Sequence, residues 1–198
     1  TADSKHLAAT ATMTLTINKA DPTIVFNDVT KNFGDVDFDL VASSNSSGTF
    51  SFTVSDTSVA TVSSSTITII GGGSTVITLS QAEVNNYNAG VATMTLTVNK
   101  ASISITFDDL TKTYGDPKFE FTATSSSTGA FSFTISNTSI ATMVDSTTAS
   151  IAAVGTSTVE VQQAADDNYK SSTATMILTV IKADPTIVFN DVTKNFGD

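Results

Sequence analysis

The sequence lacks several residue types on which common kinds of chemistry depend. It has no Cys, no Trp and no Arg, and its only His is His6. Without Cys the chain cannot form disulfides or thiolate metal sites. Its formal charge of −10 argues against binding to nucleic acid, because that affinity comes from basic residues that neutralise phosphates. No stretch approaches the roughly 20 apolar residues of a membrane-spanning helix, so this segment is not expected to insert into a membrane.

Hydroxyl and β-branched residues are abundant instead. Ser and Thr account for 62 of the 198 residues, and 40% of the residues are apolar, which is enough for a buried core. Thr, Val and Ile favour strands because branching at Cβ restricts the side chain less on a pleated sheet than in a helix. No long window shows the periodicity of an amphipathic helix. The composition therefore predicts an all-β fold.

A segment of 17 residues occurs three times along the chain. Residues 19–35 read KADPTIVFNDVTKNFGD, and residues 182–198 read the same. Residues 100–116 read KASISITFDDLTKTYGD, which is a diverged copy. A repeat of about 80 residues is longer than the usual solenoid units and suits a small domain with its own core.

The repeats predict a division of the chain into four parts. Residues 1–18 align with the end of the first complete repeat and are predicted to be the C-terminal strand region of a preceding repeat. Residues 19–99 and 100–181 are predicted to be two complete repeats. Residues 182–198 are predicted to be the first strand of the next repeat. The chain is interpreted as a window from a longer tandem array.

Apolar and hydroxyl residues alternate within each repeat. In residues 50–54 (FSFTV), the apolar side chains fall on one face and the hydroxyls on the other, as in a strand with one buried face. A one-residue insertion in the second repeat, at 143–148, predicts an exposed turn there. Seven short strands in about 80 residues predict a β-sandwich. In the first repeat the other six predicted strands are 23–26, 38–42, 59–62, 66–70, 75–79 and 93–98.

Two motifs resemble bacterial immunoglobulin-like repeats. Residues 55–62 (SDTSVATV) and 136–143 (SNTSIATM) carry the first motif. Residues 30–35 (TKNFGD) and 111–116 (TKTYGD) resemble the YGD-type (MBG-type) variant. The resemblance implies immunoglobulin-like β-sandwich domains, and a place in the stalks of large adhesins at the bacterial cell surface or in other secreted bacterial proteins. Phe33 replaces the Tyr of this motif, which leaves a packing role for that side chain.

No catalytic or cofactor-binding residues are identified, and the protein is not expected to be an enzyme. His6 aligns with Tyr87 and Tyr169, so neither complete repeat can hold a Ser-His-Asp arrangement. The acids that recur in the repeats flank turns and are interpreted as turn-forming residues that accept hydrogen bonds from nearby backbone. These recurring acids are Asp28, Asp109 and Asp191, and Asp35, Asp116 and Asp198.

Calcium is the one metal that the sequence leaves open. Asp35, Asp37 and Asp39 alternate along a predicted strand, so their carboxylates could gather around this hard cation. In the second repeat Lys118 stands in place of the middle carboxylate, and its ammonium group would repel a cation. The alternative is a solvated acidic face. No other cofactor is expected.

The connections between repeats are short. Residues 99–101 and 181–185 join the last strand of one repeat to the first strand of the next, so the domains are expected to lie end to end in an elongated rod. Pro22 and Pro185 fix the backbone at these joints. The leading prediction is a non-enzymatic structural stalk segment of a bacterial cell-surface adhesin or extracellular filament, with neighbouring repeats of the same chain as partners. Two alternatives stay open: an immunoglobulin-like module that binds a glycan or calcium, and a filament subunit that exchanges strands with copies of itself.

Overall fold

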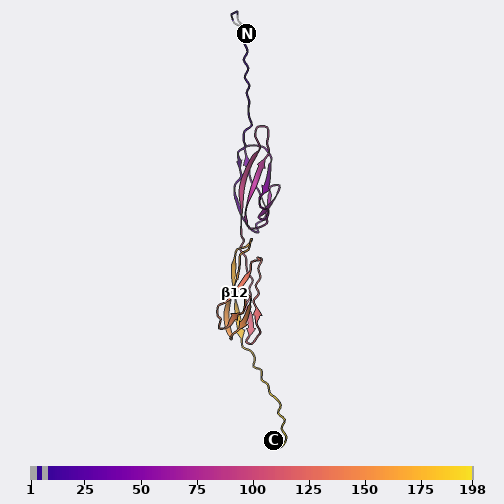
Figure 1. The fold of residues 1–198 in the computed structure, drawn as a ribbon, viewed down its shortest axis with the longest axis vertical. Helices are drawn as coiled ribbons and strands as arrows, with labels where there is room; N and C mark the ends of the chain where they lie inside the picture. Colours follow the sequence, from indigo (N-terminus) through magenta and orange to yellow (C-terminus); the bar gives the residue numbers. More distant parts are fainter. Residues whose placement is uncertain (1–3, 6–8, 198) are drawn as a thin grey trace. The chain divides into compact units, whose positions relative to one another are not determined.

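The computed structural model describes residues 4–5 and 9–197, and in these residues it contains strands but no helix (Figure 1). No element of the described chain is therefore a helix that could cross a membrane. The chain divides into two compact units, Thr1–Val98 and Asn99–Asp198. Each unit has its own hydrophobic core.

The first unit contains two main sheets. One has the strand order β2-β9-β8-β5 and the other has the order β3-β7-β6, while β1 and β4 form a short separate pair. The strands are β1 (Ile24–Val25), β2 (Val29–Asn32), β3 (Phe38–Asp39), β4 (Ser43–Ser44), β5 (Phe50–Val54), β6 (Ala60–Ser63), β7 (Thr66–Ile69), β8 (Gly73–Gln81) and β9 (Gly90–Asn99).

The second unit repeats this arrangement. Its sheets have the strand orders β10-β16-β15-β12 and β11-β14-β13, and a single bridge between Thr106 and Thr124 stands where the first unit has the β1–β4 pair. Strand β10 runs parallel to β16, and the other pairs within these two sheets are antiparallel. The strands are β10 (Leu110–Thr113), β11 (Phe119–Glu120), β12 (Phe131–Ile135), β13 (Ala141–Met143), β14 (Thr148–Ile151), β15 (Gly155–Gln163) and β16 (Ser172–Ile181).

The strand order in both units is that of an immunoglobulin-like sandwich. One sheet joins strands C, F and G of such a fold, which are β5, β8 and β9 in the first unit, and the other joins strands B, E and D. Strand β2 lies beside β9, and β10 lies beside β16, the last strand of each unit. The prediction of an all-β fold built from immunoglobulin-like sandwiches is therefore confirmed.

The alternation seen in the sequence becomes the core. In β8 and β9 the inward residues form cross-strand pairs such as Ile77 with Met94, and Leu96 opposite Thr75, all of them buried. The hydroxyl residues between them face outward, as Thr93 does. In the second unit Met176 and Leu178 occupy the positions of Met94 and Leu96 and are equally buried.

The second unit fills its core with aromatic rings. The ring of Phe121 lies 6.2 Å from that of Phe107 and 5.5 Å from that of Phe133. The aligned residue of the first unit is Leu40, which is smaller. A hollow of about 470 Å³ borders Leu40 in the first unit.

The predicted strands are found, with two differences. The prediction missed β2, whose neighbour β9 is distant in sequence, so that no local alternation marks it. Predicted strand 38–42 is shorter, and β4 follows it as a separate strand.

The predicted turn is confirmed: two residues join β6 to β7, whereas residues 144–147 join β13 to β14. Ser64 in the shorter turn has a φ of 57°, which a residue with a side chain seldom adopts.

The segments outside the two sandwiches are exposed where the structure describes them. Residues 9–18 and 182–197 contain no strand. Met13 is 86% exposed, whereas the aligned Met94 is 3% exposed. Likewise Phe189 is 94% exposed, whereas Phe26, the aligned residue of the identical segment 19–35, is 9% exposed. The apolar pattern of these segments matches the core positions of a complete unit.

Candidate functional site

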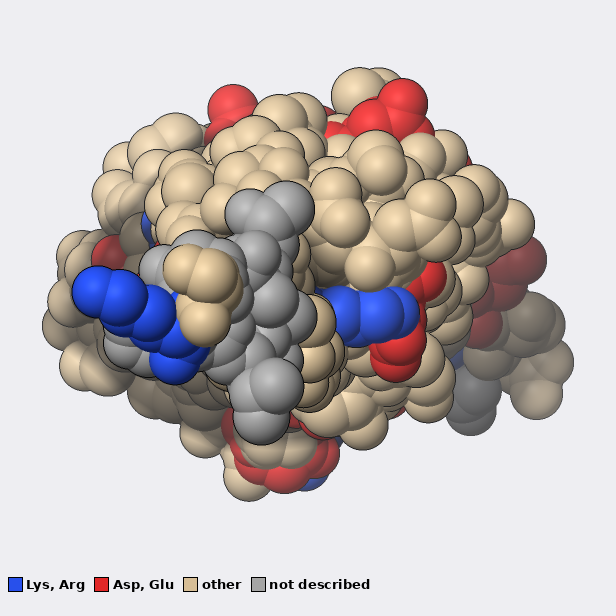
Figure 2. All heavy atoms as spheres, turned by 90° about the horizontal axis from the view of Figure 1, so that it is seen from above, with Lys and Arg blue, Asp and Glu red and all other residues tan. Residues whose placement is uncertain are grey.

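Metal binding and acid–base catalysis would depend on the titratable side chains of the described residues. No group of three or more His, Cys, Asp or Glu side chains among them could hold a metal ion. On the face shown in Figure 2, most atoms belong to uncharged residues, and the acidic groups are scattered. The only His of the sequence, His6, lies outside the described residues.

The calcium candidates each have a separate polar partner. Asp37 accepts a hydrogen bond of 2.9 Å from the hydroxyl of Thr68, and Asp39 accepts one of 2.7 Å from the hydroxyl of Thr66. Asp35 instead accepts a hydrogen bond of 2.9 Å from a backbone amide in its own turn. All three carboxylates are exposed. Calcium binding here stays one of the two alternatives that the sequence left open, and the contacts fit the other, a solvated acidic face bonded to neighbouring hydroxyls.

The YGD-type motif forms a turn closed by its Asp. In the first unit the amide of Asp35 donates to the carbonyl of Asn32 at 3.0 Å, and the carboxylate of Asp35 accepts from the amide of Asn32. Gly34 has a φ of +91°, which glycine adopts without steric cost. Asp116 and Gly115 repeat this geometry in the second unit. The recurring Asp of the motif is a local turn residue, as the sequence predicted.

The other recurring acid has a different role from the one predicted. Asp28 accepts a hydrogen bond of 2.7 Å from the backbone amide of Thr95, which lies in β9. Asp109 accepts one of the same length from the amide of Ile177 in β16. Each carboxylate thus fastens the beginning of its unit to the last strand rather than forming a local turn. The error arose because the partner is far away in sequence.

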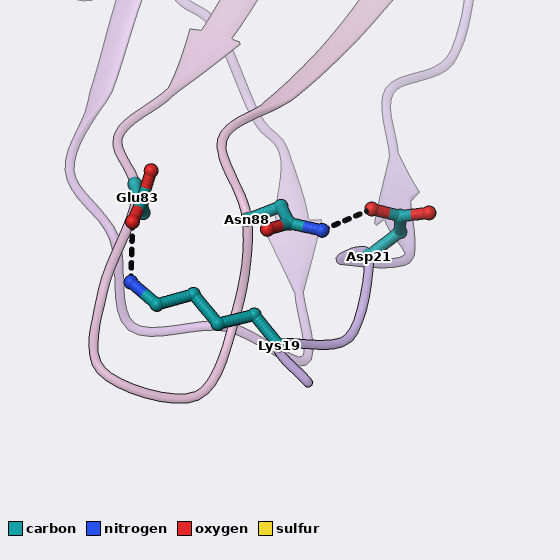
Figure 3. Close-up of polar contacts among 4 residues, drawn as sticks. All are labelled: Lys19, Asp21, Glu83 and Asn88. Carbon is teal, nitrogen blue, oxygen red and sulfur yellow. Dashed lines mark hydrogen bonds and ion pairs between the residues drawn. The ribbon is translucent and has the colours of Figure 1, made fainter. Parts of the chain in front are cut away.

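The main polar cluster of each unit fastens the incoming chain to the loop before the last strand. In the first unit Ala20 forms a parallel bridge with Tyr87, and its backbone bonds to Asn86 and Asn88 at 3.0 and 2.9 Å. Figure 3 shows two side-chain contacts that flank this bridge. They are the ion pair between Lys19 and Glu83, and the 2.7 Å hydrogen bond from Asn88 to Asp21.

The second unit fastens its incoming chain in the same place with other side chains. Ala101 bridges to Tyr169, and its amide donates to the carbonyl of Asn168 at 2.9 Å. The ammonium of Lys100 donates to the backbone carbonyl of Asp166 at 2.5 Å. We call this arrangement the chain anchor of each unit. Its residues are Lys19, Ala20 and Asp21 with loop 83–88, and Lys100 and Ala101 with loop 165–170.

The carboxylate of Asp166 organises the anchor loop of the second unit. One oxygen accepts from the hydroxyl of Ser127 and the amide of Thr128, both at 2.8 Å, and the other accepts from the amides of Asn168 and Tyr169 at 2.9 and 2.8 Å. Partial burial raises the pKa of the Asp166 carboxyl, but these hydrogen bonds outweigh burial and hold the pKa well below its ordinary value.

A buried glutamine holds the opposite loop of each unit. Gln81 is 2% exposed, and its side-chain amide donates to the carbonyls of Ser46 and Gly48, both at 3.0 Å. Its carbonyl oxygen accepts from the hydroxyl of Ser44 at 2.8 Å. These bonds satisfy the polar groups of the side chain inside the protein. Gln163 makes the equivalent bonds to Ser127, Gly129 and Ser125 in the second unit.

The sequence reasoning missed this glutamine. A polar residue ending a strand reads as the start of a loop, so neither Gln81 nor Gln163 was singled out. The usable signal was that Gln recurs at aligned positions together with a glycine, Gly48 or Gly129, and two serines.

A polar hollow lies next to the chain anchor of the first unit. Its volume is about 560 Å³, and it is lined by the side chains of Asn45, Ser47, Glu83 and Asn85 together with the half-buried Tyr87. Amides and a hydroxyl of this kind can donate to and accept from a polar ligand such as a sugar. Tyr87 is the only aromatic residue in the lining.

Comparisons with known proteins find similar folds only. No family model matches the sequence, and no curated protein matches it. The Z1Z2 domains of titin, solved in complex with telethonin, are 14% identical at a TM-score of 0.38, over 85% of this chain and 100% of that one. The EC1-2 domains of human protocadherin-24 are 10% identical at a TM-score of 0.34, over 84% and 100%. The S-layer protein SbsC (31–844) is 14% identical at a TM-score of 0.36, over 84% of this chain and 28% of that one.

Proposed function

We propose that this chain is a non-enzymatic stalk segment of the YGD-type (MBG-type) immunoglobulin-like group, and that it extends an adhesin or filament from the bacterial cell surface. The joint between the units carries the proposal. Strand β9 ends at Asn99, and Ala101 is already hydrogen-bonded into the second unit, so Lys100 is the only residue between them. A joint with one intervening residue has little slack, so units joined in this way are expected to form an extended rod.

The geometry of the first and last strands within a unit suits a load-bearing role. Strands β10 and β16 are parallel neighbours, paired from Leu110–Leu178 to Thr113–Ile181. Tension applied to the start of β10 and the end of β16 pulls the two strands past each other, so their hydrogen bonds are loaded together. The bond from Ile177 to Asp109 adds a further link between the same two segments.

The chain anchor shields this parallel pair from peeling. Because Ala101 is bonded to the loop at 168–170, tension reaches the anchor before it reaches β10. In the first unit the ion pair of Lys19 with Glu83 and the bond of Asn88 to Asp21 reinforce the same place (Figure 3). The net charge of −10 also disfavours collapse of one unit onto another.

Small-angle X-ray scattering of the 198-residue chain tests the proposed rod. The expected distance distribution peaks at the width of one sandwich and has a long tail at larger distances. A distribution typical of a globular particle would contradict the proposal. A matched variant carries a flexible Gly-Ser insertion between Asn99 and Lys100, which keeps both units intact. Its distance distribution should be smoother, with less weight at the largest distances.

Glycan binding is the second candidate function, and the polar hollow beside Tyr87 is the observation that favours it. Asn85→Ala, at an exposed position of the lining, should abolish binding to a glycan array without changing the melting temperature. If the wild-type chain binds no glycan on the array, this candidate is wrong.

A further inference from the structure

Strand β5 has a free side. It is an edge strand of its four-stranded sheet. Among the strands that the structure describes, β8 is its only partner. Strand β12 holds the same position in the second unit, paired only with β15 in the described chain. A free edge presents a row of backbone N–H and C=O groups that can pair with another strand.

The pairing with β8 shows which backbone groups of β5 face outward. The amide of Ala82 donates to the carbonyl of Thr49, and the amide of Ser55 donates to the carbonyl of Val76, both at 3.0 Å. Antiparallel strands alternate between hydrogen-bonded and non-bonded pairs. The odd-numbered residues of β5 therefore bond to β8, and the even-numbered residues of the range 50–54 direct their N–H and C=O groups away from the sheet.

The β5 edge carries no charge and no proline, unlike the opposite edge of the same sandwich. Residues 49–54 read TFSFTV. The opposite edge has Lys31 in β2 and Asp39 in β3. Natural sheets commonly place charged residues or proline on edge strands, which prevents pairing with other molecules. The second unit has the same contrast, since residues 130–135 read AFSFTI.

The hollow beside Leu40 in the first unit, lined by both apolar residues and serines, lies beside this edge. Its volume is about 470 Å³, and its lining includes Leu40, Phe50, Phe52 and Val62. Phe50 and Phe52 are only half-buried, so their rings are accessible from the edge. A strand added to β5 would place its own apolar side chains over this hollow.

We propose that β5 pairs antiparallel with β5 of a second copy of the chain, joining two stalks side by side. The strand is its own complement about Phe52: Phe50 meets Val54, and Ser51 meets Thr53. In this register every outward N–H and C=O group of one strand meets one of the other, and all apolar side chains fall on the core side. The association goes beyond the stalk function, because a single chain can carry tension without a second copy.

The charge of the chain gives this association a signature. Two copies that each carry a net charge of −10 repel one another, and salt screens that repulsion. The pairing itself uses backbone hydrogen bonds and apolar contacts. The dimer is therefore expected to become tighter as the salt concentration rises, the opposite of an association held by ion pairs.

Disulfide trapping tests the register directly, because the full chain has no native Cys. Ser51→Cys and Thr53→Cys are exposed positions that form a non-hydrogen-bonded pair in the proposed dimer. Such pairs have a Cα separation of about 4.5 Å, which lies within disulfide range. A mixture of the two variants should yield the mixed disulfide faster than either variant yields its own. Equal rates for the mixed and same-residue disulfides would overturn the proposal.

Sedimentation equilibrium of the full chain measures the association itself. Wild-type chain should form dimers as its concentration rises at high salt. In the variant S51K/T53K, like charges stand directly opposite each other twice, which should weaken the dimer about tenfold. The control S74K/S80K puts the same charges at exposed positions on the interior strand β8 and should leave the dimer unchanged. A wild-type chain that stays monomeric, or edge and control variants that behave alike, would refute self-pairing through β5.

Discussion

Gly48 lies directly against the backbone carbonyl of Ala82. A Cβ atom on Gly48 would stand 1.9 Å from that oxygen, and a Cβ atom on Gly129 would stand 1.9 Å from the carbonyl oxygen of Ala164. The close approach lets the loop before β5 reach the buried Gln81. This contact explains why glycine recurs at the same position of both units.

Replacement of Gly48 by Ala should strongly destabilise the first unit. The added methyl group cannot be accommodated against a backbone carbonyl, and we expect a loss of about 3 kcal/mol in the free energy of unfolding. Urea denaturation followed by circular dichroism measures it, with the unchanged second unit as an internal reference. Ser47→Ala, at the exposed neighbouring position, should change stability by less than about 0.5 kcal/mol. Equal effects of the two variants would show that the contact is not tight.

Replacement of Gln163 by Ala should destabilise the second unit by about 3 kcal/mol, because it opens a cavity and leaves two partly buried carbonyls without a donor. The adjacent Gln162 is exposed and provides a matched control. Gln162→Ala should leave the unfolding midpoint unchanged. Similar midpoints for both variants would contradict the role given to the buried side chain.

Asp166→Asn should make the second unit less stable at neutral pH and less sensitive to acid. The pKa of Asp166 is depressed in the folded protein, so its contribution is complete above the ordinary Asp value of about 3.9 and is lost as pH falls through the lower folded-state value. The difference in melting temperature between wild type and variant should therefore shrink below about pH 4.

Asp167→Asn is the control for this titration. Asp167 is exposed and adjacent, and its replacement should leave the acid dependence of the second unit unchanged. A melting difference for Asp166→Asn that stays constant down to low pH would mean that its carboxylate is not what stabilises the loop.

Calcium should leave the melting temperature unchanged. Asp37 and Asp39 already accept hydrogen bonds from Thr68 and Thr66, and the carboxylate of Asp35 is used in its own turn. Thermal unfolding in calcium and in EDTA measures this. An increase of several degrees in calcium that disappears in the D37N/D39N variant would establish the metal site instead.

The sequence predicted the sandwich because most of its strands alternate. Residues 50–54 and 93–98 have a clear period of two, and they form β5 and the buried part of β9. The missed strand β2 reads VTKN, with a single apolar residue, so no period of two marks it, and it exists because β9 lies beside it. Pairing between distant segments leaves no local pattern.

The polar contacts within each unit were less predictable for the same reason. Asp35 bonds to a residue three positions away and could be interpreted correctly from the sequence. Asp28 bonds to Thr95, and Gln81 bonds to Gly48, and these partners become neighbours only in the folded unit. Recurrence of a residue in the repeats indicates that it matters, but it does not identify the partner.

Stretching single molecules of the chain from both ends tests most directly whether it is a load-bearing tandem of independent sandwiches. Each unit has about 80 residues, so its unfolding should lengthen the chain by about 25 nm. A tandem of this kind should give two separate events of this size, each at a force typical of strands sheared in parallel. A single event of twice that length, or gradual extension without a force peak, would contradict it.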